Sequence, residues 1–216
     1  MSSQTLAVSR PSLRTAAYLD FIQMLTGVGL ILFIYGHSIL MASIDLGPET
    51  MNRMAKFLED SYMAQVGGPL IAIIFLVHFV LAARKIPFRS QEQRIMLDHS
   101  RRLHHLDTWL WVIQAGTAMI ILIMGSIHIW TVLTALPISA AKSAARIQGG
   151  SWLIFYIILN PLIQLHVGIG LYRIGVKWGV ITRSNRPFYK LFVTILTLIF
   201  ITLGAFTLVS FYTLIL

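Results

Sequence analysis

The chain has 216 residues, of which 56% are hydrophobic and only 12% are charged. Soluble domains carry about 25% charged residues, so this composition indicates an integral membrane protein, and the net charge of +9 indicates basic cytoplasmic loops rather than a nucleic-acid partner. The absence of cysteine excludes disulfides, thiolate-bound iron–sulfur clusters and covalently attached c-type haem.

The N-terminal residues 1–19 are polar and lack an apolar stretch beside a cleavage site, so we expect no signal peptide. Five hydrophobic segments follow, each close to or above the about 20 residues that a helix needs to cross a bilayer. Only helices suit such segments in lipid, and we expect residues 1–216 to form a single domain, an all-α bundle of five transmembrane helices. These helices are expected at residues 20–44, 66–83, 109–136, 152–176 and 191–216.

Two of the connecting loops are long enough to contain a helix. Residues 46–65 place acidic side chains between apolar ones, which is typical of a short amphipathic helix, and residues 91–98 within the 86–108 loop are also helical in pattern. The second helix is basic, so it either lies on the membrane surface or binds a soluble partner. We see no internal repeat.

The distribution of basic residues predicts the orientation. Thirteen Lys and Arg residues lie in the N-terminal tail and in the loops that follow the second and fourth hydrophobic segments, and four lie in the other two loops. Cytoplasmic loops carry the excess of Lys and Arg. We therefore expect the N-terminus in the cytoplasm and the C-terminus in the periplasm.

Four histidines lie inside hydrophobic segments, one in each of the first four: His37, His78, His128 and His166. An ionisable side chain in the hydrocarbon core is costly, so each imidazole needs a partner. Because consecutive helices run in opposite directions, His37 and His128 fall in an outer layer and His78 and His166 in an inner layer. At about 1.5 Å per residue, each layer lies roughly 10–15 Å from its own surface.

Two imidazoles at one depth on facing helices can hold one haem iron, and helical bundles build cofactor sites in this way. Such ligation leaves no open position on the iron, which favours electron transfer over oxygen chemistry. The pattern predicts two b-type haems stacked across the membrane. The alternative is a haem-free transporter or scaffold whose histidines relay protons or stabilise packing. His99, His104 and His105 lack the spacing of a zinc site and are expected to be exposed.

With these features the chain resembles the dihaem cytochrome b subunit of menaquinol:fumarate reductases, within the succinate:quinone oxidoreductase family. The resemblance covers essentially the whole chain and rests on one His in each of the first four segments and none in the fifth. The local motifs are Tyr35-Gly36-His37-Ser38, Phe75-Leu76-Val77-His78, Ser126-Ile127-His128 and Gln164-Leu165-His166-Val167-Gly168.

The resemblance implies a three-subunit enzyme of the bacterial inner membrane. A flavoprotein binds fumarate, an iron–sulfur protein relays electrons, and this lipid-embedded subunit anchors both on the cytoplasmic side and oxidises menaquinol. Electrons would pass from the outer haem to the inner haem. The resemblance does not decide between fumarate reduction and succinate oxidation as the physiological reaction, nor whether the complex is a dimer. The close alternatives are the cytochrome b anchors of a succinate dehydrogenase, a hydrogenase or a formate dehydrogenase.

The resemblance also implies roles for individual residues. It assigns the inner iron to His78 and His166 and the outer iron to His37 and His128, the same pairs that the loop charges give. Other matching positions are Gln23, Trp111 and Lys177 at the inner-haem propionates and Arg146 near the outer haem. Without the resemblance, Trp111 is an interfacial aromatic residue and Lys177 a cytoplasmic charge.

Two acidic positions of the family bear on proton transfer. Glu59 falls where the family has a glutamate at the outer quinol site, and a carboxylate there can accept a proton from quinol. The alternatives are an ordinary acidic loop residue at this position, or the neighbouring Asp60 in the same role. Related enzymes carry a glutamate two residues before the fourth histidine, where this chain has Gln164. Since Gln164 cannot titrate, a proton path through this position is not implied here.

Overall fold

A computed structural model describes residues 13–215, and within that range the chain is helical with no strand. The expectation about a signal peptide falls largely on residues 1–12, outside the described residues. Five stretches are long and apolar enough to cross a membrane. Their long helices are α1 (Leu13–Met41), α3 (Gly68–Ala83), α5 (Leu106–Leu133), α7 (Ser151–Lys177) and α8 (Arg186–Thr213).

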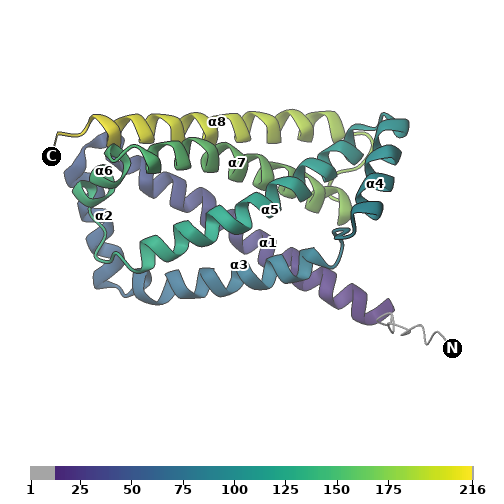
Figure 1. The fold of residues 1–216 in the computed structure, drawn as a ribbon, viewed down its shortest axis with the longest axis horizontal. Coiled ribbons are helices and arrows are strands. Elements are labelled where there is room, and N and C mark those ends of the chain that lie inside the picture. The colour runs from purple at the N-terminus through teal and green to yellow at the C-terminus, as the bar shows by residue number, and fades with distance from the viewer. Residues whose placement is uncertain (1–12, 216) are drawn as a thin grey trace.

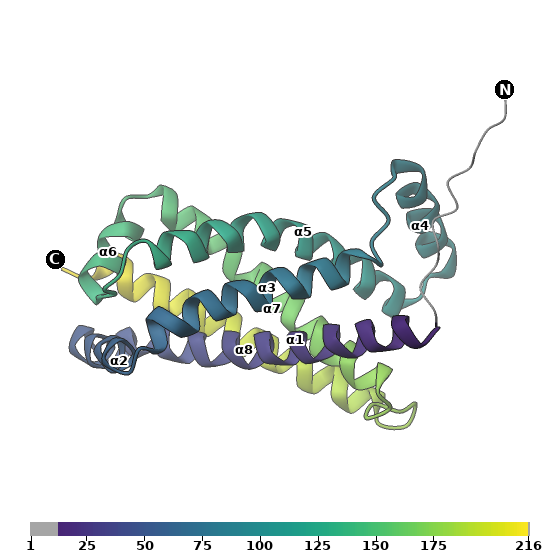
Figure 2. The same ribbon diagram turned by 90° about the horizontal axis from the view of Figure 1, so that it is seen from below.

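The five long helices lie side by side in an elongated bundle, and short helices close its two ends (Figures 1 and 2). The C-terminal end of the bundle carries η1 (Ala42–Leu46), α2 (Pro48–Asp60), η2 (Met63–Gly67) and α6 (Ala140–Gln148). The opposite end carries α4 (Ser90–Leu103). Consecutive long helices run in opposite directions, so α1 and α5 run one way and α3 and α7 the other.

The five predicted transmembrane segments are confirmed, with boundaries shifted by a few residues. The third helix ends at Leu133 instead of residue 136, shortly before Pro137, a residue that commonly follows the end of a helix. The fifth helix begins at Arg186 instead of residue 191, with Pro187 in its first turn, where its missing N–H costs nothing. The predicted end of that segment, residue 216, lies outside the described residues.

The two helices expected in the loops are also present, as α2 and α4. Sequence reasoning missed α6, between the third and fourth transmembrane helices. The Ser139 hydroxyl caps this helix by accepting from the Lys142 backbone N–H at 3.2 Å. Such a cap is a recognisable helix start, but the helix has only nine residues.

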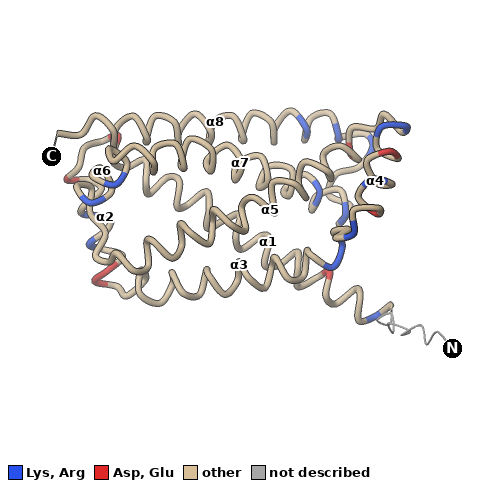
Figure 3. Tube along the Cα trace, in the orientation of Figure 1, with Lys and Arg blue, Asp and Glu red and all other residues tan. Residues whose placement is uncertain are grey.

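Charged residues gather at the two ends of the bundle and leave its middle bare (Figure 3). This separation is what a bilayer requires, because charges in the hydrocarbon core are costly. The end that carries α4 has more blue positions, Lys and Arg, than the end that carries α2 and α6. That this basic end faces the cytoplasm stays a prediction.

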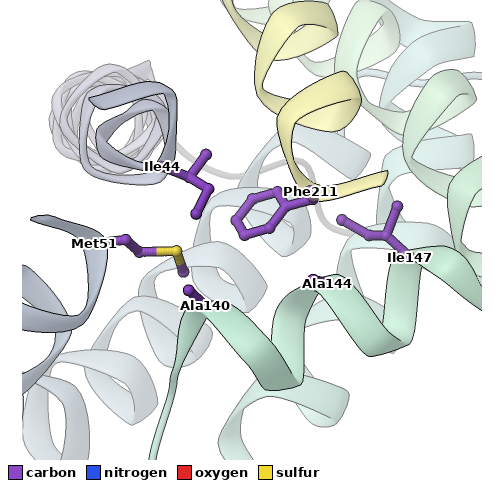
Figure 4. Packing of buried hydrophobic residues seen from close by; sticks show 6 residues of the cluster. All are labelled: Ile44, Met51, Ala140, Ala144, Ile147 and Phe211. Carbon is purple, nitrogen blue, oxygen red and sulfur yellow. The ribbon is translucent and has the colours of Figure 1, made fainter. Parts of the chain in front are cut away.

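A compact hydrophobic cluster holds the α2 and α6 end together (Figure 4). Its buried members are Ile44, Met51, Ala140, Ala144, Ile147 and Phe211. Phe211 is only 1% exposed, and it joins α8 to α6 and η1. The Gln148 side-chain nitrogen lies 2.7 Å from the Leu214 carbonyl oxygen and 3.2 Å from that of Phe211, so α6 also satisfies backbone carbonyls at the end of α8.

Candidate haem-binding site

A cavity of about 1220 Å³ runs along the inside of the bundle. Typical pockets for one small ligand measure about 300–1,000 Å³, so this space is larger than one such ligand needs. All four membrane histidines line it, from α1, α3, α5 and α7. The rest of its wall is mainly apolar, with charged side chains toward its two ends.

The outer pair of histidines faces one another across the cavity. The ring centroids of His37 on α1 and His128 on α5 lie 6.0 Å apart, with their planes at 62°. An imidazole–metal bond is about 2 Å long, so two imidazoles on one metal have ring centroids about 6 Å apart. The hydroxyl of Tyr156 lies 3.1 Å from Nδ1 of His128, and His37 stacks on Phe33. The spacing of this pair therefore fits a shared iron.

In the inner layer, His78 on α3 is held by α1. Its Nδ1 lies 3.1 Å from the Thr26 hydroxyl oxygen and 3.2 Å from the Gln23 carbonyl oxygen. The Thr26 hydroxyl donates to the carbonyls of Ile22 and Gln23, so its oxygen is left to accept. Both contacts therefore require a proton on Nδ1, which leaves the Nε2 lone pair free for a metal.

His166 on α7 is held by α5 in the same way. Its Nδ1 lies 3.1 Å from the Thr117 hydroxyl oxygen and 3.1 Å from the Gln114 carbonyl oxygen. Metal-bound histidines nearly always donate their other ring N–H to an oxygen, which fixes the tautomer and the ring orientation. The donor set of the inner pair therefore fits axial ligation.

Two glycines let the cavity walls approach the side-chain rings of His78 and Phe75 closely. A Cβ at Gly27 would lie 3.0 Å from the Cε1 atom of His78, and a Cβ at Gly125 would lie 3.3 Å from the Phe75 ring. A side chain at either position would displace its aromatic neighbour. Bare helix faces of this kind are what a flat macrocycle between helices requires.

The residues expected at the inner-haem propionates line the α4 end of the cavity. These are Gln23, Trp111 and Lys177. The Lys177 ammonium lies 2.6 Å from the Asp20 carboxylate. Asp20 also pairs with Lys85 at 2.7 Å.

Two further cations line this end, and sequence reasoning missed them. Lys85 donates to the Gln23 side-chain oxygen at 3.0 Å, and Arg173 donates to that of Gln114 at 3.0 Å. Within residues 13–215, Arg173 has no carboxylate within ion-pair distance, although it lies partly buried in the cavity wall. Each follows an inner-layer histidine by seven residues, which was the available sequence signal.

At the opposite end, Arg146 on α6 lines the cavity, and its guanidinium lies 5.9 Å from the Trp152 ring. Glu59 at the end of α2 does not line the cavity among the described residues. It accepts a hydrogen bond from the Ile138 backbone N–H at 2.7 Å. Asp60 is exposed and pairs with Lys56. The structure therefore places Glu59 beside the cavity wall with one oxygen engaged by the backbone.

Gln164 is buried beside the two histidine layers, with 3% of its surface exposed. Its side-chain nitrogen lies 3.4 Å from the Ser38 hydroxyl, while its side-chain oxygen has no partner among residues 13–215. At the α4 end, His99, His104 and His105 are exposed, as expected. In the described part of the chain no three His, Cys, Asp or Glu side chains converge as metal ligands, whereas a haem takes only two.

Together these features define a multi-pass membrane protein in which four histidines line an internal cavity. The comparisons with known proteins place it further. A sequence model described as "Succinate dehydrogenase/Fumarate reductase transmembrane subunit" matches residues 90–206. The fumarate reductase cytochrome b subunit of Helicobacter pylori J99 is 34% identical over 88% of this chain and 78% of its own length.

Two other relatives extend the comparison. The fumarate reductase cytochrome b subunit of Wolinella succinogenes is 30% identical over 92% of this chain and 82% of its own length. The succinate dehydrogenase cytochrome b558 subunit of Bacillus subtilis is 23% identical over 80% of this chain and 84% of its own length. The chain therefore belongs to the family of succinate dehydrogenase and fumarate reductase transmembrane subunits. The expected family and the location in a bacterial inner membrane are confirmed.

Proposed function

We propose that this chain, as a single domain, is the membrane anchor and quinol-oxidising subunit of a fumarate reductase complex and binds two b-type haems. One observation carries the proposal: histidines on the first four long helices line one cavity that follows the length of the bundle. In the outer layer, the His37 and His128 rings have the spacing of two imidazoles on one metal. The relatives named fumarate reductase cytochrome b subunit support the assignment to this enzyme.

When bound, the two haems supply one-electron transfer between the quinol end and the opposite end of the bundle. His37 and His128 would hold the outer haem, and His78 and His166 the inner one. Gln23, Trp111 and Lys177 would bind the inner propionates, because N–H donors and cations suit carboxylates. Arg146 would serve the outer haem in the same manner.

Menaquinol oxidation releases two protons and two electrons, so the outer end of the cavity needs a proton acceptor. Glu59 offers one: its Oε1 accepts from the Ile138 amide, and its second carboxylate oxygen remains available for a proton. Gln164 has no titratable group, so the proposal contains no proton path through that side chain.

The α4 end would face the cytoplasm and bind the iron–sulfur subunit, with the flavoprotein beyond it. The exposed basic residues of this end provide an electrostatically attractive surface for an acidic partner. Arg94, Arg101 and Arg102 on α4 are examples. Fumarate reduction itself would take place on the flavoprotein.

The purified complex tests this proposal through its haem content. A pyridine haemochrome assay is expected to give two b-type haems per chain. His37→Ala should lose only the outer haem and His78→Ala only the inner one, while His99→Ala, an exposed histidine on α4, should keep both. A wild-type chain without haem would remove the proposal and favour the transporter.

The relative named succinate dehydrogenase cytochrome b558 subunit supports a second candidate, the anchor of a succinate dehydrogenase. Both candidates use the same haem site. Assays of the complex with menaquinol and fumarate, and with succinate and menaquinone, distinguish the physiological direction. Nickel or molybdenum in the co-purifying subunits would instead point to a hydrogenase or a formate dehydrogenase.

A further inference from the structure

Two pairs of helices in this bundle share one pattern of residues. On α1 and α5, a glutamine is followed three residues later by a threonine and eleven residues after that by a histidine. These residues are Gln23, Thr26 and His37 on α1 and Gln114, Thr117 and His128 on α5. On each partner helix, a histidine is followed seven residues later in the chain by a cation. These pairs are His78 on α3 with Lys85, two residues past the end of that helix, and His166 with Arg173, both on α7.

The contacts within each pair repeat as well. The threonine hydroxyl oxygen and the glutamine backbone carbonyl oxygen both accept from Nδ1 of the histidine on the paired helix, at distances of 3.1–3.2 Å. The glutamine side chain accepts from the partner's cation at 3.0 Å in each case. Matching spacing and matching contacts on four different helices are hard to explain as coincidence.

The small residues of the cavity wall follow the same pattern. The residue after each threonine is Gly27 or Ala118, and the residue four positions after each inner histidine is Ala82 or Gly170. All four line the cavity. Each copy therefore presents a bare face next to its inner histidine.

The pattern relates α1–α3 to α5–α7, and equivalent helices run in the same direction along the bundle (Figure 1). Such parallel repeats are related by an axis along the membrane normal. His37 is equivalent to His128 and His78 to His166, so each expected haem iron would be held by equivalent positions of the two copies. This pattern departs from the expectation of no internal repeat, and it was not apparent in the sequence because it lies in a few spaced residues.

We propose that α1–α3 and α5–α7 are two copies of one ligand-positioning unit. In it, Thr26 and Thr117 are equivalent positioning residues that hold His78 and His166 with Nε2 toward the cavity. This inference rests on the proposed haem binding. It assigns a role to two threonines that touch neither the cofactor iron nor a substrate but act through the ligand histidines.

The outer layer shows where the two copies differ. Tyr156, ten residues before His166, contacts His128, whereas the equivalent position ten residues before His78 is Gly68. His37 accordingly has no hydrogen-bonding partner among the described residues and stacks on Phe33 instead. The contacts of the two threonine hydroxyls therefore involve only the inner histidines. Removing these hydroxyls should leave the outer haem in place.

The test uses the full complex with Thr26→Val and Thr117→Val, which keep side-chain volume and remove the hydroxyl. Thr26→Ser and Thr117→Ser restore the hydroxyl. Thr131→Val is the matched control, because Thr131 on α5 also donates to its own helix, at 2.8 Å to Ile127, but does not line the cavity. Haem content and the low-spin electron paramagnetic resonance signals are measured, with His78→Ala marking the outer-haem signal.

Each valine variant should release the inner haem about 10-fold faster or more, since removing such a partner costs about 10–100-fold in metal affinity. The inner-haem signal should shift, the outer signal should persist and show that the bundle is folded, and the serine variants should restore the wild type. The inference would be overturned if both valine variants kept the wild-type inner-haem signal and released the inner haem at the wild-type rate. It would also be overturned if only one of the two valine variants changed the inner-haem signal or its release. If the wild type binds two haems in that experiment, the proposed function survives; a wild type without haem would overturn both.

Discussion

The membrane histidines differ in what holds the ring nitrogen that faces away from the cavity. In the inner layer, two oxygens accept from Nδ1 of each histidine. In the outer layer, His128 has one phenol oxygen at 3.1 Å, and His37 has no such partner in the described part of the chain. Because these contacts fix ring orientation and ligand basicity, the outer pair should depend heavily on Tyr156.

Tyr156→Phe should therefore loosen the outer haem while leaving the inner one unchanged. The variant removes the oxygen next to His128 and keeps the ring, so we expect about 10-fold faster loss of the outer haem. The release of haem to apomyoglobin measures this rate. Tyr172→Phe is the control on the same helix, because Tyr172 donates to Asp107 at the other end of the bundle. Equal haem release by both variants would contradict the prediction.

Glu59 combines a structural contact with a proposed chemical role, and two substitutions separate them. Glu59→Gln keeps an oxygen for the Ile138 amide but cannot accept a proton, so quinol oxidation should fall about 100-fold or more at an unchanged melting temperature. Glu59→Ala should lose both the hydrogen bond to Ile138 and the proton acceptor, so its quinol oxidation rate and its melting temperature should both fall. Asp60→Asn, at an exposed residue that pairs with Lys56, should keep the wild-type rate. A Glu59→Gln enzyme with normal kcat would leave Glu59 only its structural contact.

At the level of elements, α2 and α6 close one end of the bundle. Phe211 of α8 packs among residues of η1, α2 and α6 in this cluster (Figure 4). This interface helps to fix Arg146, which precedes the cluster residue Ile147 on α6, and Glu59, which accepts a hydrogen bond from Ile138, a residue packed against the cluster. The structure of the outer end of the cavity therefore depends on the packing of this cluster.

Phe211→Ala should destabilise the protein by about 3–5 kcal/mol, the usual cost of removing a buried phenylalanine ring. Phe206→Ala is the matched control, because Phe206 lies on the same helix and is 64% exposed. Reversible unfolding in detergent with increasing denaturant compares the two variants. A similar loss in both would mean that the cluster does not stabilise the outer end.

The elements that sequence reasoning predicted well are those with a one-dimensional signature. Hydrophobic length gave the five long helices, and amphipathic pattern gave α2 and α4. The short α6 was missed, although Ser139 caps it, because nine residues between two membrane spans carry little periodic signal. For Glu59 the family position indicates a chemical role, whereas its bond to Ile138 depends on how two distant loops meet.

For the whole molecule, alternating helix direction was enough to place the histidines in two layers. Which ring nitrogen faces the cavity depends on helix rotation, which spacing alone does not determine. The threonine partners of His78 and His166 were visible as residues, but each contact joins positions about fifty residues apart. The cavity likewise exists only once the helices of the bundle are assembled around it.

Orientation is the property of the whole molecule on which the direction of proton and electron movement depends. The chain has no cysteine, so single cysteines can report which end is accessible. Arg53→Cys on α2 and Arg94→Cys on α4 are matched, because both residues are exposed and both changes remove one positive charge. A membrane-impermeant maleimide should label Arg53→Cys in intact spheroplasts and Arg94→Cys only after permeabilisation. That result places the quinol end outside, so that quinol protons are released to the periplasm while fumarate is reduced in the cytoplasm. The opposite labelling would invert the bundle, put the basic α4 end in the periplasm and rule out a cytoplasmic iron–sulfur partner at that surface.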